Sequence, residues 1–389
     1  MIHRTLAKTL QNRASLYPVV TLTGPRQSGK TTLCRMLFPE KPYLSLEALD
    51  TREFAMQDPR GFLAQVPDGA VLDEVQRAPG LLSYLQEEVD RDPRTGRFIL
   101  TGSENLALNQ AVTQSLAGRT ALLHLLPCSR AEVAAFTAPP RDLWSSVWSG
   151  GFPRVFDQGI PPPVWFSDYV ATYVQRDVRQ LLQVGDLRTF SSFLRLAAGR
   201  TGQVLNMSGL ASDVGVAVNT IKAWISVLEA SYLVALLPAW HGNTRKQVVK
   251  APKLHFLDSG LACHLLGIQA AEQLSLHPLR GALFESWVVS EVFKARLNQG
   301  LGPDGFHFRE TRGLEVDLLV RGRRGWLLVE AKSAQTLDGE FFKHLQALRE
   351  QLGRDSVAGM RLVFGGESSV QRSGTEAVAW HSLQGMDWA

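Results

Sequence analysis

The chain has 389 residues, of which 45% are hydrophobic and 20% charged. This composition excludes a disordered protein and suits two or three globular domains. The net charge of +4 allows a nucleic-acid partner without requiring one. Three widely spaced cysteines exclude a disulfide framework and a zinc cluster. No segment is apolar enough to span a membrane, and no signal-peptide core follows the N-terminus. We therefore expect a cytoplasmic protein.

In chain order, the first part of the sequence alternates strand-like and helix-like patterns, as a parallel α/β sheet does. Strands are predicted at 19–23, 43–46, 70–73, 97–101 and 121–125. Two proline-rich breaks follow, and the next segment is predicted to be helical. Two short helices and a hairpin come next, and a mixed α/β region ends the chain. We divide the chain into a nucleotide-binding domain, a helical lid, a helix-turn-helix region and a C-terminal α/β domain: 1–135, 136–200, 201–257 and 258–389.

Residues 24–31 match the phosphate-loop pattern G-x-x-x-x-G-K-[ST] at every fixed position. A strand-like segment precedes them and a helix-like segment follows, so backbone N–H groups at the helix start can bind phosphate. We expect Lys30 to reach the β- and γ-phosphates and the Thr31 hydroxyl to ligate Mg²⁺. The predicted ATP-binding residues are Gly24, Pro25, Arg26, Gln27, Ser28, Gly29, Lys30, Thr31, Thr32 and Ser103.

Two carboxylates end the predicted strand at 70–73, and they suit the chemistry of nucleotide hydrolysis. Asp73 can hold Mg²⁺ through water beside Thr31, and Glu74 can polarise the attacking water. Thr101 or Ser103, at the end of the next strand, can sense the γ-phosphate. Arg119 can stabilise the transition state, in cis or from a neighbouring subunit, or it can be a solvated surface residue.

The segments 207–215 and 218–228 suit two helices joined by a glycine-containing turn, with Asn219 as a helix cap. The segments 233–237 and 253–257 can pair as a wing. Basic residues lie between or at the ends of these strands: Arg245, Lys246, Lys250 and Lys253. A basic wing beside a recognition helix suits contacts to the phosphates of double-stranded DNA. Packing against another domain is the alternative interpretation.

Acidic residues and a lysine recur in the C-terminal region. Glu285, Asp317, Glu330 and Lys332 together resemble the PD-(D/E)-x-K pattern of metal-dependent nucleases, with Val316 in place of the proline. The three carboxylates would hold one or two Mg²⁺ ions, and Lys332 would orient or activate a water molecule. An inactive nuclease-like scaffold, or a hairpin with a surface salt bridge, is the alternative.

The chain resembles a prokaryotic family of AAA-type ATPases that carry a C-terminal domain of unknown function related to PD-(D/E)XK nucleases. The resemblance rests on residues 24–32, 72–79, 98–103, 115–119, 150–153, 173–178, 256–261 and 279–285. It implies an α/β fold with a P-loop NTPase (AAA-type) parallel sheet, a helical lid, a winged helix-turn-helix and a nuclease-like domain.

The resemblance also implies ATP and Mg²⁺ as ligands, ATP hydrolysis and the possibility of a homo-oligomer. Three hypotheses remain open for what the protein does. The first is an ATPase whose cycle moves its downstream domains. The second is a DNA-processing machine with an ATP-gated nuclease. The third is a nucleotide-gated interaction switch that cleaves nothing.

Overall fold

The computed structural model describes residues 2–103, 115–173, 187–241, 250–311 and 313–388. The chain divides into two compact units. Unit 1 contains Met1–Pro127, Ala230–Tyr232 and Leu297–Gly300, and unit 2 contains Cys128–Glu229, Leu233–Arg296 and Leu301–Ala389. The first division falls between Pro127 and Cys128, a few residues before the predicted boundary at 135. The segments predicted as lid, helix-turn-helix and C-terminal domain fall together in unit 2, apart from Ala230–Tyr232 and Leu297–Gly300.

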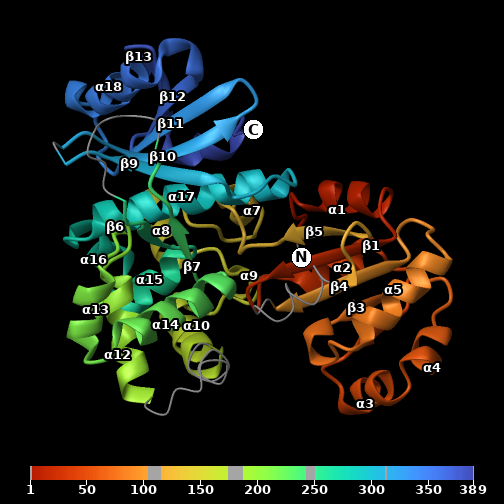
Figure 1. Ribbon diagram of the computed structural model, residues 1–389. Helices are drawn as coiled ribbons and strands as arrows, with labels where there is room; N and C mark the ends of the chain where they lie inside the picture. Colours follow the sequence, from red (N-terminus) through yellow and green to blue (C-terminus); the bar gives the residue numbers. More distant parts are fainter. Residues whose placement is uncertain (1, 104–114, 174–186, 242–249, 312, 389) are drawn as a thin grey trace. The chain divides into compact units, whose positions relative to one another are not determined.

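Unit 1 is built on a parallel sheet of five strands (Figure 1). The strands are β1 (Val19–Gly24), β2 (Tyr43–Ser45), β3 (Ala70–Asp73), β4 (Phe98–Ser103) and β5 (Thr120–His124), in the order β2-β3-β4-β1-β5. All five predicted strands are confirmed. Each neighbouring pair is parallel, so the carboxyl ends of all five strands meet at one edge of the sheet.

Helices cover both faces of this sheet, because alternate residues of each strand are apolar on opposite sides. The helices are α1 (Ala7–Ala14), α2 (Lys30–Leu37), α3 (Leu49–Gln57), α4 (Pro59–Ala64) and α5 (Leu81–Arg91), with a 3₁₀ turn at Val75–Arg77. Val20 and Leu22 share a core with α1 and α2. Val19 packs with α3, α4 and α5 on the other side. The strand that leads into the phosphate loop is thereby buried on both faces.

The first part of unit 2 is mostly helical. Its helices are α7 (Arg130–Val133), α8 (Leu143–Ser149), α9 (Pro153–Asp157), α10 (Pro162–Tyr169), α12 (Leu187–Ala198), α13 (Met207–Val214), α14 (Val218–Ala230), α15 (Ser259–Leu265), α16 (Ala271–Leu276) and α17 (Arg280–Asn298). A small antiparallel sheet has the order β6-β8-β7, with β6 (Gln203–Val204), β7 (Val234–Leu237) and β8 (Lys253–Phe256). No described helix combines the length and hydropathy needed to cross a bilayer.

The two helices and the hairpin predicted in this region are present as α13, α14, β7 and β8. Trp224 of α14 packs edge-on against Phe190 of α12 at 5.3 Å between ring centroids, which fixes the inner face of α14. Asn219 is not the cap of α14: the helix begins at Val218, and the carbonyl of Ala217 accepts the first helical bond, from Ile221 N. Arg245 and Lys246 lie outside the described residues.

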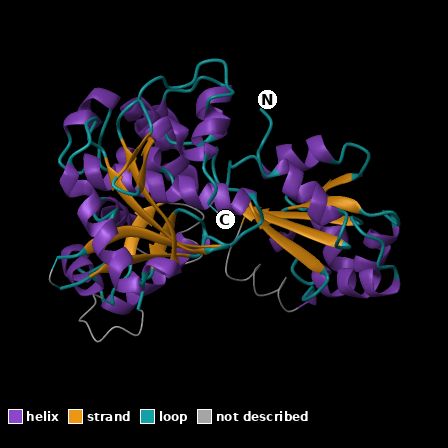
Figure 2. Ribbon diagram, turned by 90° about the horizontal axis from the view of Figure 1, so that it is seen from above, coloured by secondary structure: helices purple, strands orange, loops and turns teal. Residues whose placement is uncertain are grey.

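The second part of unit 2 is a six-stranded mixed sheet (Figure 2). Its order is β13-β14-β12-β11-β10-β9, with β9 (Gly305–Arg309), β10 (Glu315–Gly322), β11 (Gly325–Lys332), β12 (Val357–Phe364), β13 (Val370–Arg372) and β14 (Thr375–Ala379). The predicted hairpin of β10 and β11 is confirmed. Helix α18 (Lys343–Leu352) packs its Leu345 and Leu348 into the apolar core of this sheet. Short 3₁₀ turns complete the unit: Gly339–Phe342, Arg354–Ser356 and Trp380–Gly385.

Candidate functional site

The phosphate loop joins β1 to α2 at the carboxyl edge of the first sheet. Gly29 has a φ of +95° and Gly24 a φ of +147°, both in the region that favours glycine. A Cβ on Gly24 would lie only 2.2 Å from the carbonyl oxygen of Leu125. The glycines of the pattern are therefore required by the backbone, which brings the loop to the start of α2.

Two cations hold the loop from within. Lys30 is buried, and its Nζ donates to the carbonyls of Gly24 and Pro25 at 2.9 Å each. Arg4 donates to the carbonyl of Ser28 at 2.7 Å and to a carbonyl of the loop after β5. The sequence around Arg4 does not predict these hydrogen bonds, because their acceptors lie far along the chain.

The electrostatics of Lys30 make it sensitive to the charge beside it. Burial lowers the pKa of its ammonium to about 8, although Glu74 and Asp73 raise the pKa and so oppose this effect. Arg26 lowers the pKa further. A phosphate bound at the loop would restore the protonated form, because a nearby anion favours the charged state of a lysine.

Asp73 is the centre of a hydrogen-bond network. The Thr31 hydroxyl lies 3.1 Å from its Oδ1, and the Tyr43 hydroxyl donates to its Oδ2 at 2.6 Å. The Thr101 hydroxyl also donates to Oδ1. The structure therefore brings Thr31 and Asp73 together, as the sequence predicted. Tyr43 was not predicted, although its place on the strand next to β3 is the signal that could have indicated it.

Glu74 follows Asp73 in the left-handed backbone region, with a φ of +59° that is unusual for a residue other than glycine. Its Oε2 accepts hydrogen bonds from the Gln76 amide and, at 3.2 Å, from the Ser103 hydroxyl. Gln76 also donates to Ser103 Oγ at 2.9 Å. Ser103 thus lies beside Glu74, where the sequence predicted a polar sensor. Gln76 is an additional member of the group.

Arg119 lies away from these residues. It precedes β5, and its carbonyl accepts a hydrogen bond from Val19 N at the start of β1, whereas the phosphate loop follows the end of β1. Six residues of strand separate the two edges, about 20 Å. The guanidinium pairs with Asp90 of α5 through Nε and Nη2. The cis arrangement considered for Arg119 is therefore not present in this structure.

A second cluster of charges lies in unit 2 and includes the predicted nuclease-like residues. Glu285 on α17 and Asp317 on β10 both contact the ammonium of Lys253, at 2.8 Å and 3.3 Å. Glu315 contacts it at 2.7 Å. Lys253 is 1% exposed, so it is not a basic group at the tip of a wing. That part of the sequence interpretation is corrected: three buried or half-buried carboxylates hold Lys253 away from solvent.

The two remaining residues of the pattern lie beside this group. Lys332 pairs with Glu330 at 2.5 Å, and Ala331 N donates to Asp317 Oδ2 at 2.9 Å. The described residues contain no group of three His, Cys, Asp or Glu side chains arranged to hold a metal ion. The metal-binding role predicted for Glu285, Asp317 and Glu330 therefore stays a prediction.

The pKa shifts in this cluster follow from burial and from its mixed charges. Burial alone would lower the pKa of Lys253, but Asp317, Glu285 and Glu315 outweigh it and raise the pKa. Burial alone would raise the pKa of Asp317, but Lys253 and Lys332 outweigh it and lower the pKa. Burial and the Asp317 charge raise the pKa of Glu330. The lysines and Asp317 are therefore held in their charged forms.

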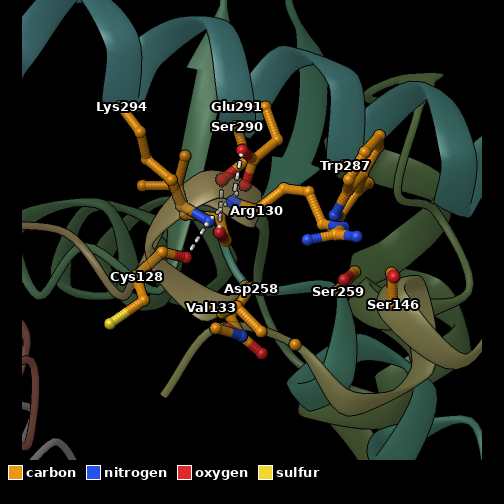
Figure 3. A pocket seen from close by; sticks show the side chains of 13 residues that line it. Cys128, Arg130, Val133, Ser146, Asp258, Ser259, Trp287, Ser290, Glu291 and Lys294 are labelled. Atoms are coloured by element: carbon orange, nitrogen blue, oxygen red, sulfur yellow. Dashed lines mark hydrogen bonds and ion pairs between the residues drawn. The ribbon is translucent and has the colours of Figure 1, made fainter. Parts of the chain in front are cut away.

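A separate polar pocket in unit 2 holds segments that are distant in sequence (Figure 3). Asp258 accepts hydrogen bonds from Gly151 N at 2.8 Å and Leu261 N at 2.9 Å. On the opposite wall, Glu291 pairs with Lys294 at 2.8 Å and accepts from Arg130 N. Asp258, Glu291 and Lys294 are thus hydrogen-bonded to one another's segments or to the backbone, whereas Arg130 Nε, in the same lining, is buried without a hydrogen-bond partner among the described residues.

Comparison with known proteins agrees with the geometry of unit 1. Residues 16–134 match the family model described as "AAA domain". This segment is therefore similar to AAA domains. Residues 140–272 and 280–383 match two further models, "Domain of unknown function (DUF8612)" and "Domain of unknown function (DUF4143)". The match supports an AAA-type nucleotide-binding domain around the first sheet, while the downstream regions match families whose function is unknown.

The chain is also similar to curated and solved proteins. It is 29% identical to "Uncharacterized protein Rv2008c" of Mycobacterium tuberculosis and "Uncharacterized protein Mb2031c" of Mycobacterium bovis, over 96% of this chain and 82% of each relative. A Walker-type ATPase of Pyrococcus abyssi is similar in structure, with 16% identity and a TM-score of 0.42 over 67% of this chain and 94% of that chain. AMPPCP-bound DnaA from Aquifex aeolicus is also similar, with 15% identity and a TM-score of 0.29 over 58% of this chain and 85% of that chain. At these TM-scores the structural similarities carry no argument about function.

Proposed function

We propose that unit 1 binds ATP with Mg²⁺ and hydrolyses it. The observation that carries the proposal is the position of the Thr31 hydroxyl, 3.1 Å from Asp73, at the sheet edge where the glycine loop and Lys30 also lie. These are the groups that phosphoryl-transfer sites of P-loop proteins bring together. The AAA domain match over residues 16–134 supports the same conclusion.

Each group has a separate task in this proposal. Backbone N–H groups at the start of α2 and the Lys30 ammonium would bind the phosphates. Thr31 and Asp73 would hold Mg²⁺, which neutralises charge on the phosphates when it is bound. Glu74 would accept a hydrogen bond from the attacking water. Gln76 and Ser103 bind Glu74 Oε2, so they would fix where that carboxylate points.

Two substitutions test the assignment in opposite ways. Lys30→Ala removes a phosphate-binding charge and should abolish ATP binding, measured by titration with a fluorescent ATP analogue. Glu74→Gln keeps the shape of the side chain and should bind ATP but turn it over at least about 100-fold more slowly. Normal ATP affinity in Lys30→Ala would refute the proposal. Unchanged turnover in Glu74→Gln would remove Glu74 from its catalytic role.

Arg119 can act on bound phosphates only if a second copy of the chain supplies it, since its own sheet holds it at the other edge. The corresponding proposal is a nucleotide-dependent homo-oligomer. Light scattering with and without ATP would show whether mass increases. Arg119→Ala should then lower turnover but not affinity. Equal turnover in wild type and variant would end this role for Arg119.

For unit 2, contact with double-stranded DNA is a candidate function. Asn219 and Lys222 are exposed on the side of α14 opposite its buried residues, and Lys250 is exposed before β8. Binding through these residues should weaken steeply as salt rises, because phosphate contacts release counterions. Lys222→Ala should reduce that salt slope. Affinity for a protein partner with no DNA binding would instead favour the nucleotide-gated interaction switch.

A further inference from the structure

The charged cluster of unit 2 contains Lys253 in addition to the predicted nuclease-like residues, and Lys253 lies at its centre. Lys253 donates toward three carboxylates, Glu315 at 2.7 Å, Glu285 at 2.8 Å and Asp317 at 3.3 Å. An ammonium has three N–H donors and no acceptor, so this set matches its capacity. The three oxygens surround one positive charge in the way that ligands surround a bound cation.

The distances in the cluster suit a nitrogen cation. Mg²⁺ requires oxygen ligands at about 2.0–2.1 Å in near-octahedral geometry. The contacts of Lys253 are 2.7–3.3 Å, and they are ordinary charge-assisted hydrogen-bond lengths at the short end. For Mg²⁺ to bind among the same oxygens, Lys253 would have to leave and the carboxylates would have to move inward.

The backbone gives Lys253 little freedom to leave. It lies on β8, the central strand of the small sheet, with Val204 of β6 and Leu237 of β7 as its register partners on either side. All four residues of β8 are buried. Its backbone is therefore held on both sides, and its buried ammonium is held by three carboxylates, which distinguishes it from a surface lysine that exchanges between partners.

The cluster has a strong need for positive charge. Glu330 is 3% exposed, and its Oε2 has no hydrogen-bond partner among the described residues. Its other oxygen pairs with Lys332. Four carboxylates, Glu285, Glu315, Asp317 and Glu330, thus face two buried or half-buried lysines, and Glu315 also pairs with the more exposed Arg309 at 3.5 Å. Removing Lys253 would take away the cation that contacts three of these carboxylates, and would leave the buried Asp317 charge with less compensation, which is costly in a protein interior.

We propose that the Lys253 side chain is the resident cation of this cluster, in the place where a nuclease would hold a divalent metal ion. The C-terminal fold is then a scaffold that neither needs a metal ion nor cleaves nucleic acid. This inference does not depend on ATP hydrolysis by unit 1. It selects the non-cleaving alternative for unit 2 and leaves open which partner that scaffold binds.

Manganese binding to the full chain without nucleotide tests the proposal directly. The wild type and Asp317→Asn should bind the same amount of Mn²⁺. Electron paramagnetic resonance measures the free Mn²⁺ that remains in each sample. Lys253→Met keeps an unbranched apolar side chain, one atom shorter than lysine and without its charge, and it should gain one Mn²⁺ site that Asp317→Asn abolishes. Lys250→Met is the matched control, because Lys250 is an exposed lysine on the same segment, and it should behave as wild type.

Thermal unfolding gives a second readout. Lys253→Met should lower the unfolding midpoint by roughly 10 °C, and millimolar Mn²⁺ should restore part of the loss only in that variant. The proposal would be overturned if the wild type bound Mn²⁺ and Asp317→Asn did not. It would also be overturned if the wild type cleaved a plasmid with Mg²⁺ and Asp317→Asn did not. The comparison of wild type with Asp317→Asn decides the matter even if Lys253→Met does not fold.

Discussion

ATP affinity should depend on pH because Lys30 sits in a site that disfavours its charge. Burial lowers its pKa to about 8 without nucleotide, and bound phosphates should raise it again. The protonated fraction of free protein falls from about 0.9 at pH 7 to about 0.1 at pH 9. If the bound form stays protonated, the Kd should rise about tenfold over this range, or about 1.4 kcal/mol.

The assay is a titration with a fluorescent ATP analogue and Mg²⁺ at pH 7, 8 and 9 and constant ionic strength. Lys30→Arg is the matched control, since a guanidinium stays protonated throughout and its affinity should be flat with pH. The control also accounts for ionisation of the phosphates themselves. A wild-type Kd that is the same at pH 7 and pH 9 would refute the account of Lys30 as a buried, partly deprotonated group.

Two further predictions concern stability. Gly150→Ala should lower the free energy of unfolding by about 1–3 kcal/mol in a denaturant titration, since its Cβ would lie 2.3 Å from Asp258 Oδ1 at a φ of +66°. Gly159→Ala, at a φ of +63° with open space around it, should cost only about 1 kcal/mol. His124 has a pKa lowered by burial to about 4, against 6.5 in the unfolded chain. The unfolded chain therefore binds the proton first, and stability should fall by up to about 3 kcal/mol as pH drops from 6.5 to 4. His124→Gln should show a shallower fall, and equal slopes for the two proteins would contradict the pKa assignment.

The nucleotide site could be predicted well because its signals are local. The spacing of Gly24, Gly29 and Lys30 is contained in eight residues, and a strand and a helix on either side specify their context. Asp73 follows from the apolar run before it. Parallel pairing then brings it to the edge that holds Thr31, and this pairing can be expected from the alternation of strands and helices.

The remaining contacts depend on packing that no local pattern encodes. Tyr43 reaches Asp73 from a neighbouring strand, and Gln76 turns back to Glu74 because of a left-handed backbone at that residue. Lys253 looked like a surface residue because lysines in short strands normally alternate toward solvent. Its strand is buried on both faces, and its carboxylate partners lie 32 to 64 residues further along the chain.

The hydrogen bond from Gly151 to Asp258 has a consequence for synthesis on the ribosome. The two residues are 107 positions apart, so at about 5–20 residues per second Asp258 is made roughly 5–20 s after its partner. The first sheet is complete in sequence once His124 has been made. We therefore expect the first sheet to form early. The helices from α8 onward cannot complete their packing until Asp258 has been synthesised, so their apolar faces stay exposed and accessible to chaperones during that time.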